Sequence, residues 1–195
     1  MKSINIALPK DTYKLLEDMI GRMFVKISCN KFIYSNAVYG IVGIYVDKNV
    51  YKITNFVDVL DYYGKTEDVA VFKFEKTYID DIESAVQDEA MHDIPIDKKI
   101  IKIDVVNENQ VQYKNYKIMY DNWVTRGIIF YFDDGSEISF EKDIWFSEDI
   151  YVERGKNLLD TFASVDEFSD AWKLDDENDI SEYTGTAKRK ILSIV

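Results

Sequence analysis

Residues Trp123 to Ile150 read WVTRGIIFYFDDGSEISFEKDIWFSEDI, and this stretch decides the fold. Two apolar-rich runs flank Asp134-Gly135, a pair that tolerates the positive φ angles of a two-residue turn. The stretch therefore predicts a tight antiparallel hairpin in which Tyr131 faces Ile138. In this register the first strand is apolar on both faces and central, whereas the second strand turns one face toward solvent or a partner. That second face holds Glu137, Ser139 and Glu141.

The rest of the chain carries strand and helix patterns in turn. Period-two alternation predicts strands at residues 3–8, 24–29, 38–46, 67–74, 99–106, 111–119 and 187–195. Capping residues and wider apolar spacing predict helices at residues 9–22, 55–63 and 155–162, and others beginning at Thr77 and Ser164. The sequence thus predicts an α+β fold, an antiparallel meander and hairpin sheet packed with several short helices.

Domain organisation has two interpretations. Pro95 is one of two prolines in 195 residues and precedes the long strand patterns. It favours an N-terminal α+β subdomain at residues 1–94 and a C-terminal antiparallel sheet with closing helices at residues 95–195, and one continuous domain is the alternative. No run has the length of a signal peptide or a membrane span, and the single cysteine, Cys29, excludes an internal disulfide. We expect a cytoplasmic protein that does not bind membranes.

Charge is strongly segregated along the chain. Residues 58 to 95 hold eleven carboxylates against three lysines, and residues 133 to 182 hold seventeen against four basic residues. The net charge is −12, so the remaining residues together carry +9. Blocks of one sign repel nucleic acid and attract basic partners. The sequence therefore predicts a basic protein partner and no direct binding of nucleic acid.

Catalytic and metal-binding patterns are weak. His92 is the only histidine, which leaves the Glu-x-x-His pattern at Glu89 without the second histidine that a di-iron site needs. The acidic run near residue 175 has the alternate spacing of a calcium loop, but Ile180 stands where the sharp turn needs glycine. Asp133 and Asp134 are typical turn formers rather than a catalytic carboxylate pair. We expect a protein that is not an enzyme, with no catalytic residues, cofactor or metal.

Two segments of the hairpin carry a resemblance. Residues 123–129 (WVTRGII) and 137–148 (EISFEKDIWFSE) resemble uncharacterised proteins of Gram-positive bacteria that tend to lie in phages or conjugative elements. The resemblance implies a mobile-element context and carries over no functional residues. Together with the charge, it favours a non-enzymatic inhibitor of anti-CRISPR or anti-restriction type, which occupies the basic groove of a nucleic-acid-binding defence protein. Two alternatives stay open: an immunity or antitoxin-type protein, and a divalent-ion-dependent enzyme.

The predicted partner-binding residues lie in the second acidic block. Trp145 and Phe146 have the composition of an aromatic interaction hot spot with an acidic border. Carboxylates spaced over such a surface imitate phosphates. The full set is Glu137, Glu141, Asp143, Trp145, Phe146, Glu148, Asp149, Asp175, Asp176, Glu177 and Asp179.

Overall fold

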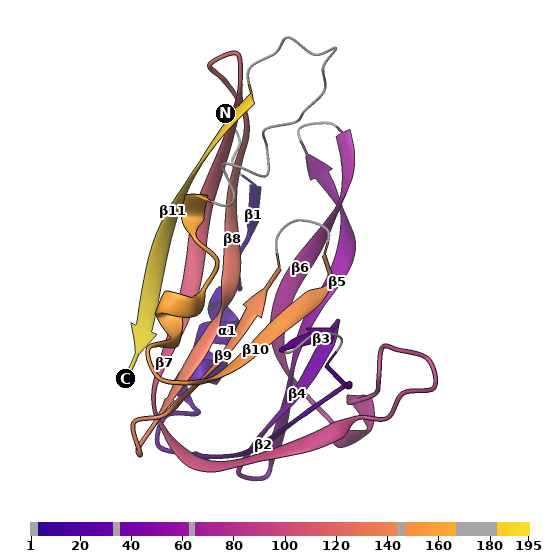
Figure 1. Cartoon of the computed structure of the whole chain (residues 1–195), viewed down its shortest axis with the longest axis vertical. Helices are drawn as coiled ribbons and strands as arrows, with labels where there is room; N and C mark the ends of the chain where they lie inside the picture. The colour runs from indigo at the N-terminus through magenta and orange to yellow at the C-terminus, as the bar shows by residue number, and fades with distance from the viewer. Residues whose placement is uncertain (1–3, 33–35, 63–64, 144–146, 167–182) are drawn as a thin grey trace.

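The computed structural model describes residues 4–32, 36–62, 65–143, 147–166 and 183–195 (Figure 1). This part of the chain is mostly β, with eleven strands in one sheet and a single α-helix. No helix in it is long and apolar enough to cross a membrane. The strands are β1 (Ile4–Ile6), β2 (Met23–Cys29), β3 (Ala37–Tyr39), β4 (Ile41–Val46), β5 (Asn49–Tyr62), β6 (Lys65–Thr77), β7 (His92–Lys114), β8 (Lys117–Phe132), β9 (Glu137–Lys142), β10 (Asp149–Gly155) and β11 (Tyr183–Ile194). The helix is α1 (Lys10–Glu17), and two short 3-10 turns are η1 (Ile79–Asp81) and η2 (Leu158–Thr161).

The sheet closes on itself through Gly40. Hydrogen-bonded neighbours follow the order β3-β10-β9-β8-β7-β2-β4-β5-β6, and Gly40 alone separates β3 from β4. Its N–H donates to the Glu148 carbonyl at 3.0 Å, and its carbonyl accepts the Asn55 N–H at 2.9 Å. Gly40 has φ 70°, and an added Cβ would lie 2.3 Å from the Phe56 ring. Glycine is therefore required where the chain turns from β3 into β4.

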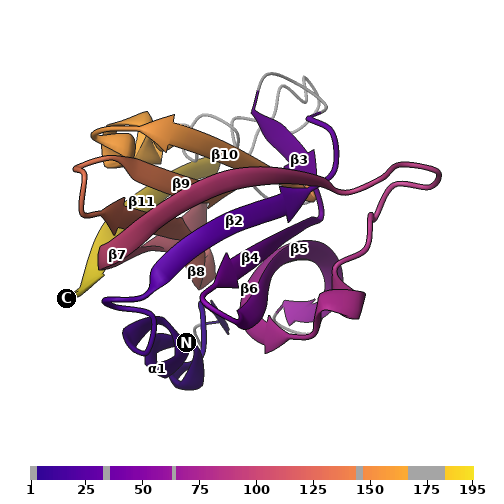
Figure 2. The ribbon, with the colours of Figure 1, turned by 90° about the horizontal axis from the view of Figure 1, so that it is seen from below.

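Strand β7 joins the two halves of the sheet. Its residues 92–99 pair with β2, and its residues 100–114 pair with β8 on one side and, from residue 103, with β11. Figure 2 shows β7 running beside β2 for much of its length. The predicted boundary between residues 94 and 95 falls inside this strand. Strand β1 pairs in parallel with residues 122–124 of β8, on the same edge as β9 but farther along the strand.

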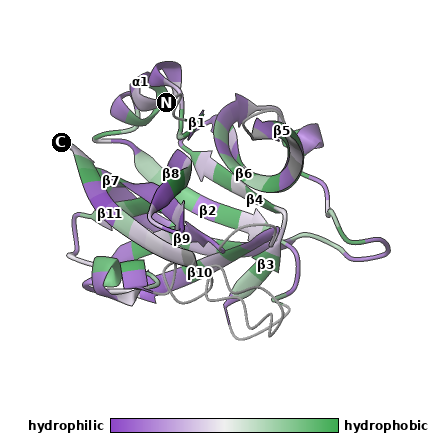
Figure 3. Ribbon diagram, turned by 90° about the horizontal axis from the view of Figure 1, so that it is seen from above, coloured by the Kyte–Doolittle hydropathy of each residue, from purple (hydrophilic) through white to green (hydrophobic). Residues whose placement is uncertain are grey.

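Two apolar clusters lie on opposite faces of β8. Hydrophobic and hydrophilic residues alternate along the strands (Figure 3), so each strand contributes to one face at every second position. The main core fills the closed sheet, with Phe130 edge-on to Phe24 at 5.1 Å and to Phe140 at 6.0 Å between ring centroids. A smaller cluster on the outer face lies beneath η2. It consists of Val106, Ile129, Leu158 and Phe162.

The predicted hairpin exists, but its register is wrong by one residue. Tyr131 pairs with Glu137 and not with Ile138, because the loop has three residues and ends with Gly135 at φ 77°. The Phe132 N–H donates to the Ser136 carbonyl at 2.9 Å and closes this loop. With this shift of one residue, the apolar face of β9 lies on the same side of the sheet as the face of β8 that borders the main core. These inward residues are Ile128, Phe130, Phe132, Ile138 and Phe140.

The α+β prediction with several short helices is wrong, and residues 55–63 show why. Residues 55–62 continue β5, which pairs with β6 as far as Tyr62 and Lys65. The Asn55 side chain does not cap a helix: its amide donates to the carbonyls of Ser147 and Asp149, both at 3.0 Å. Pairing with β6 and anchoring to the segment before β10 thus override the capping signal.

The acidic helix predicted from Thr77 is also absent. Only η1 forms there, and Asp88 adopts a left-handed φ of 63°. Residues 80–90 contain five carboxylates and no lysine or arginine, so a helix would place like charges one turn apart without compensation. The side chain of Ile82 instead packs closely against Gly43 of β4, where an added Cβ would lie 2.7 Å from Ile82 Cγ2.

Other predicted elements agree more closely with the structure. The strands at 24–29 and 67–74 are confirmed within β2 and β6, and the strand at 187–195 is confirmed as far as Ile194, where β11 ends. The first helix is confirmed but ends at Glu17 rather than at residue 22. In place of the helix predicted at residues 155–162, β10 ends at Gly155 and the short turn η2 follows. Most of the helix predicted from Ser164 lies outside the described residues.

Candidate functional site

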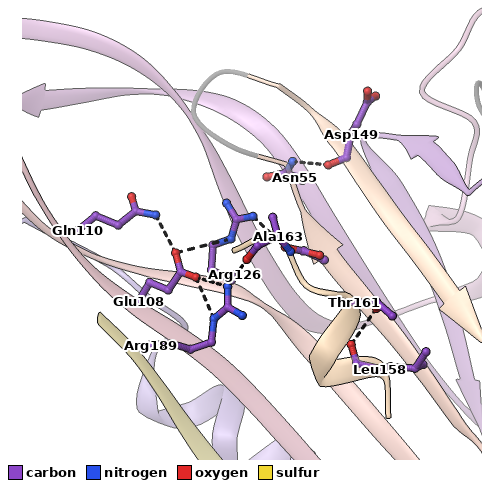
Figure 4. Close-up of polar contacts among 10 residues, drawn as sticks. Asn55, Glu108, Gln110, Arg126, Asp149, Leu158, Thr161, Ala163 and Arg189 are labelled. Atoms are coloured by element: carbon purple, nitrogen blue, oxygen red, sulfur yellow. Dashed lines mark hydrogen bonds and ion pairs between the residues drawn. The ribbon is translucent and has the colours of Figure 1, made fainter. Parts of the chain in front are cut away.

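A bulge in β8 directs Arg126 into a buried cluster of charges on the outer face of the sheet. Val106 pairs with Gly127 and Asn107 with Thr125, which leaves Arg126 as the extra residue. Its guanidinium donates from Nη2 to Glu141 Oε1 at 2.8 Å, and its Nε lies 3.8 Å from Glu108 Oε2 (Figure 4). Arg126 is only 3% exposed. A charge buried to this extent needs opposite charges beside it, and here two carboxylates supply them.

Glu108 is the centre of this cluster. Arg189 on β11 donates to Glu108 Oε1 from Nη2 at 2.6 Å and from Nε at 3.0 Å. Gln110 donates to the other carboxylate oxygen at 3.0 Å. Two arginines and two glutamates therefore neutralise one another across β7, β8, β9 and β11. We name Glu108, Arg126, Glu141 and Arg189 the ion cluster.

The segment around η2 is fastened over the ion cluster. The Ala163 N–H donates to Glu141 Oε1 at 3.0 Å, and the Ala163 carbonyl accepts a hydrogen bond from Arg189. At the start of the segment, the Glu137 carboxylate accepts the N–H groups of Asn157 and Leu158 at 3.0 and 2.8 Å. The outer-face carboxylates of β9 thus hold a covering segment in place.

A pocket of about 280 Å³ opens beside the ion cluster. Arg126 is the one cation among its lining residues, and it is already bonded to Glu141. Asp149 lies next to this pocket, since the Asp143 N–H donates to the Asp149 carbonyl at 3.1 Å. We name it the acidic pocket. Its polar lining consists of Asn36, Arg126, Glu141, Asp143, Tyr151, Glu153 and Thr161.

Burial and neighbouring charges raise the pKa of three groups in or beside the acidic pocket. Burial, and then the charges of Asp143 and Glu148, raise the pKa of Asp149 above its ordinary value. Burial, and then the charges of Asp143, Asp149 and Glu141, raise the pKa of the Tyr151 phenol. Burial also raises the pKa of Glu141, against the opposing effect of Arg126. The shifts of Asp149 and Tyr151 indicate negative charge beside the pocket, which a bound cation would offset.

Lys142 lies on the opposite, inner face of β9. Its side chain is buried in the core, and its Nζ donates to the Ala70 carbonyl at 2.7 Å. Burial, and then the positive charge of Arg126, lower the pKa of this lysine to about 7. Lys142 therefore ties β9 to β6 and does not line the acidic pocket.

The structure brings together only part of the predicted partner-binding set. Glu141 and Asp143 line the acidic pocket, and Asp149 lies beside it. Glu141 is 7% exposed, so it does not face solvent as the predicted register required. Glu148 accepts the Val57 N–H at 2.7 Å and a bond from the Tyr39 hydroxyl. The residues outside the described part of the chain are Trp145, Phe146, Asp175, Asp176, Glu177 and Asp179.

Sequence reasoning missed several residues of this site. Glu108, Arg189 and Glu153 come from strands whose pairing no local pattern reveals. Arg126 carried a usable signal, because it lies beside Gly127 and is the one charged residue from Trp123 to Phe132. Gly127 permits the close approach of β9, since an added Cβ would lie 2.1 Å from the Phe140 carbonyl oxygen.

In the described residues, no group of three or more histidine, cysteine, aspartate or glutamate side chains is arranged to hold a metal ion. Comparison of the chain with protein-family models, with curated proteins and with solved structures finds no match. The resemblance to mobile-element proteins therefore stays a prediction, and the function has to be argued from the site.

Proposed function

We propose that this protein is a non-enzymatic binding protein whose acidic pocket accepts a guanidinium or ammonium group from a basic protein partner. One observation carries the proposal. Three carboxylates line the pocket, and Arg126, the one cation among the lining residues, already donates a hydrogen bond to one of them, Glu141. A cationic side chain from outside would neutralise the excess charge. It would also gain charge-assisted hydrogen bonds, which are stronger than neutral ones.

Arginine suits this pocket better than lysine. The volume of about 280 Å³ accommodates the end of one long side chain. Glu141 is fixed by Arg126 at 2.8 Å and by the Ala163 N–H at 3.0 Å, so one wall is preorganised. A planar guanidinium can bond several fixed oxygens at once, whereas an ammonium acts as a point charge.

The partner class follows from the charge of the whole molecule. A net charge of −12 accelerates encounter with basic surfaces and rejects nucleic acid. We propose as partner a nucleic-acid-binding protein, such as a host nuclease, whose basic groove this protein occupies in competition with nucleic acid. An immunity-type protein directed at a nuclease toxin would use the same pocket.

Calorimetric titration with an arginine-rich peptide tests the proposal. The variant Asp143→Asn/Asp149→Asn/Glu153→Gln should bind the peptide about tenfold more weakly, because charge-assisted bonds contribute roughly 1.5–3 kcal/mol each before compensation. The control Asp80→Asn/Glu83→Gln/Asp88→Asn removes the same charge from exposed positions away from the pocket. It should change the affinity by less than about twofold at physiological salt.

A lysine-rich peptide of equal length provides the second comparison and should bind more weakly than the arginine-rich peptide. Equal losses of affinity in the two triple variants would show that the peptide senses only the overall charge. That result would contradict a role for the acidic pocket.

A further inference from the structure

A second pocket lies on the inner face of β7, away from the ion cluster, and has the opposite charge. Its volume is about 530 Å³, within the range of small-molecule sites. It is formed where α1, β1, β7, β8 and β11 meet. We name it the lysine pocket, and its polar and aromatic lining is Asn5, Lys10, Tyr13, Asn107, Trp123 and Lys190.

The residues that line this pocket do not neutralise the charge of its two lysines. No aspartate or glutamate is among the lining residues. Within the described part of the chain, neither Lys10 nor Lys190 makes an ion pair. Both side chains are exposed. In a protein with a net charge of −12, two cations left without carboxylates at one pocket are a feature that a bound anion would explain.

An aromatic wall stands beside these lysines. Trp123 pairs through its backbone with Asn5 of β1, and its side chain is half-buried. Among the described residues its indole has no hydrogen-bond or ring partner, so both the N–H and the ring face are available. Tyr13 on α1 contributes a second ring, and Leu192 on β11, 39% exposed, extends the apolar surface.

The floor of the pocket is held rigidly. Asn107 donates to the Tyr13 hydroxyl at 3.2 Å and accepts from the Thr125 hydroxyl at 2.6 Å. The same Thr125 oxygen accepts the Leu8 N–H at 2.9 Å. These hydrogen bonds join β7, β8, α1 and the segment after β1. The aromatic and cationic groups are therefore carried by a preorganised frame, which lowers the entropic cost of binding.

We propose that the lysine pocket binds a small planar aromatic anion. The ammonium groups of Lys10 and Lys190 hold its phosphate or carboxylate, and its ring stacks on Trp123 or Tyr13. A nucleoside monophosphate has these properties and suits the volume, whereas a long nucleic acid would be repelled by the acidic remainder of the molecule. The site is independent of the acidic pocket.

The test is calorimetric titration of the full chain with adenosine monophosphate, adenosine, inorganic phosphate and benzoate. Adenosine monophosphate or benzoate should show saturable binding. Adenosine and inorganic phosphate, each of which carries half of the recognised features, should bind at least about tenfold more weakly than adenosine monophosphate if phosphate is the anion.

Two double variants locate the site. Lys10→Gln/Lys190→Gln should weaken the binding by at least about tenfold, whereas Lys14→Gln/Lys188→Gln removes the same charge from exposed positions of α1 and β11 and should change it less than about twofold. Trp123→Leu should weaken binding with the lysines intact. Absence of saturable binding by both aromatic anions in the millimolar range, or equal losses in the two double variants, would overturn the proposal.

Discussion

Asn107 and Glu108 are neighbours in β7, yet their side chains belong to two sites of opposite character. Glu108 lies on the outer face, where two arginines and two glutamates compensate one another away from water. Asn107 lies on the inner face, at the floor of a pocket whose two lysines are exposed. The comparison separates charge that maintains the fold from charge that is available to a ligand. Burial and pairing, rather than residue type, distinguish the two.

The largest expected effect comes from the outer face. Arg126→Met leaves Glu141 buried without its guanidinium and removes one of the two arginines beside Glu108. Breaking a buried ion cluster on one side costs about 3–5 kcal/mol of unfolding free energy. Urea denaturation would measure the loss. Arg154→Met, at an exposed position of β10, is the matched control and should cost less than about 0.5 kcal/mol.

Lys142 is a buried cation that makes no ion pair with a carboxylate among the described residues, and it tests whether such a cation behaves differently. Its pKa in the folded protein is about 7, below its ordinary value of 10.5. Between these values the unfolded chain binds a proton that the folded chain does not, so the unfolding free energy attributable to Lys142 rises with pH. The slope approaches about 1.4 kcal/mol per pH unit. Below pH 7 the cost of the buried charge is fully present.

Urea denaturation of the wild type and Lys142→Met from pH 7 to about 9.5 measures this contribution, since tyrosines ionise above that range. The rise should be present in the wild type and missing in the variant. Parallel curves for the two proteins would show that Lys142 titrates normally, and the contrast between paired and unpaired buried cations would then fail.

How much of this arrangement the sequence could predict depends on whether the cause is local. The hairpin, β2, β6, β11 and the start of α1 follow from alternation, turn residues and a proline, which act within a few positions. The register of the hairpin does not, because burial of Phe130 and Phe140 in one core selects the three-residue loop. Asn55 illustrates the same limit, since its partners Ser147 and Asp149 lie more than 90 positions away.

The sites were less predictable than the fold. Composition places Asp143 and Glu141 in an acidic block of the sequence, but it does not reveal that Arg126 and the covering segment bind Glu141 in the ion cluster. The lysine pocket gathers residues 5 to 192 from five elements, and no window of sequence contains it. Long-range pairing, which brings β11 beside β7, creates both sites at once.

A smaller effect is expected at the floor of the lysine pocket. Asn107→Ala removes the hydrogen bonds to Tyr13 and Thr125, at 3.2 and 2.6 Å, in a nearly buried position. The expected loss is about 1–2 kcal/mol of unfolding free energy, because neutral hydrogen bonds contribute less than charged ones. Thermal and urea denaturation would measure it. A loss as large as that of Arg126→Met would contradict the ranking of the two faces.

The smallest change in unfolding free energy is expected for the exposed lysines of the inner face. Lys10→Gln/Lys190→Gln removes two positive charges, as many as the ion cluster contains, but neither lysine makes an ion pair within the described residues. The unfolding free energy should therefore change by less than about 0.5 kcal/mol. Urea denaturation of this variant beside Arg126→Met compares cations of the two faces directly. A loss of several kcal/mol would mean that Lys10 and Lys190 are structural, and the charge of the inner face would then not be free for a ligand.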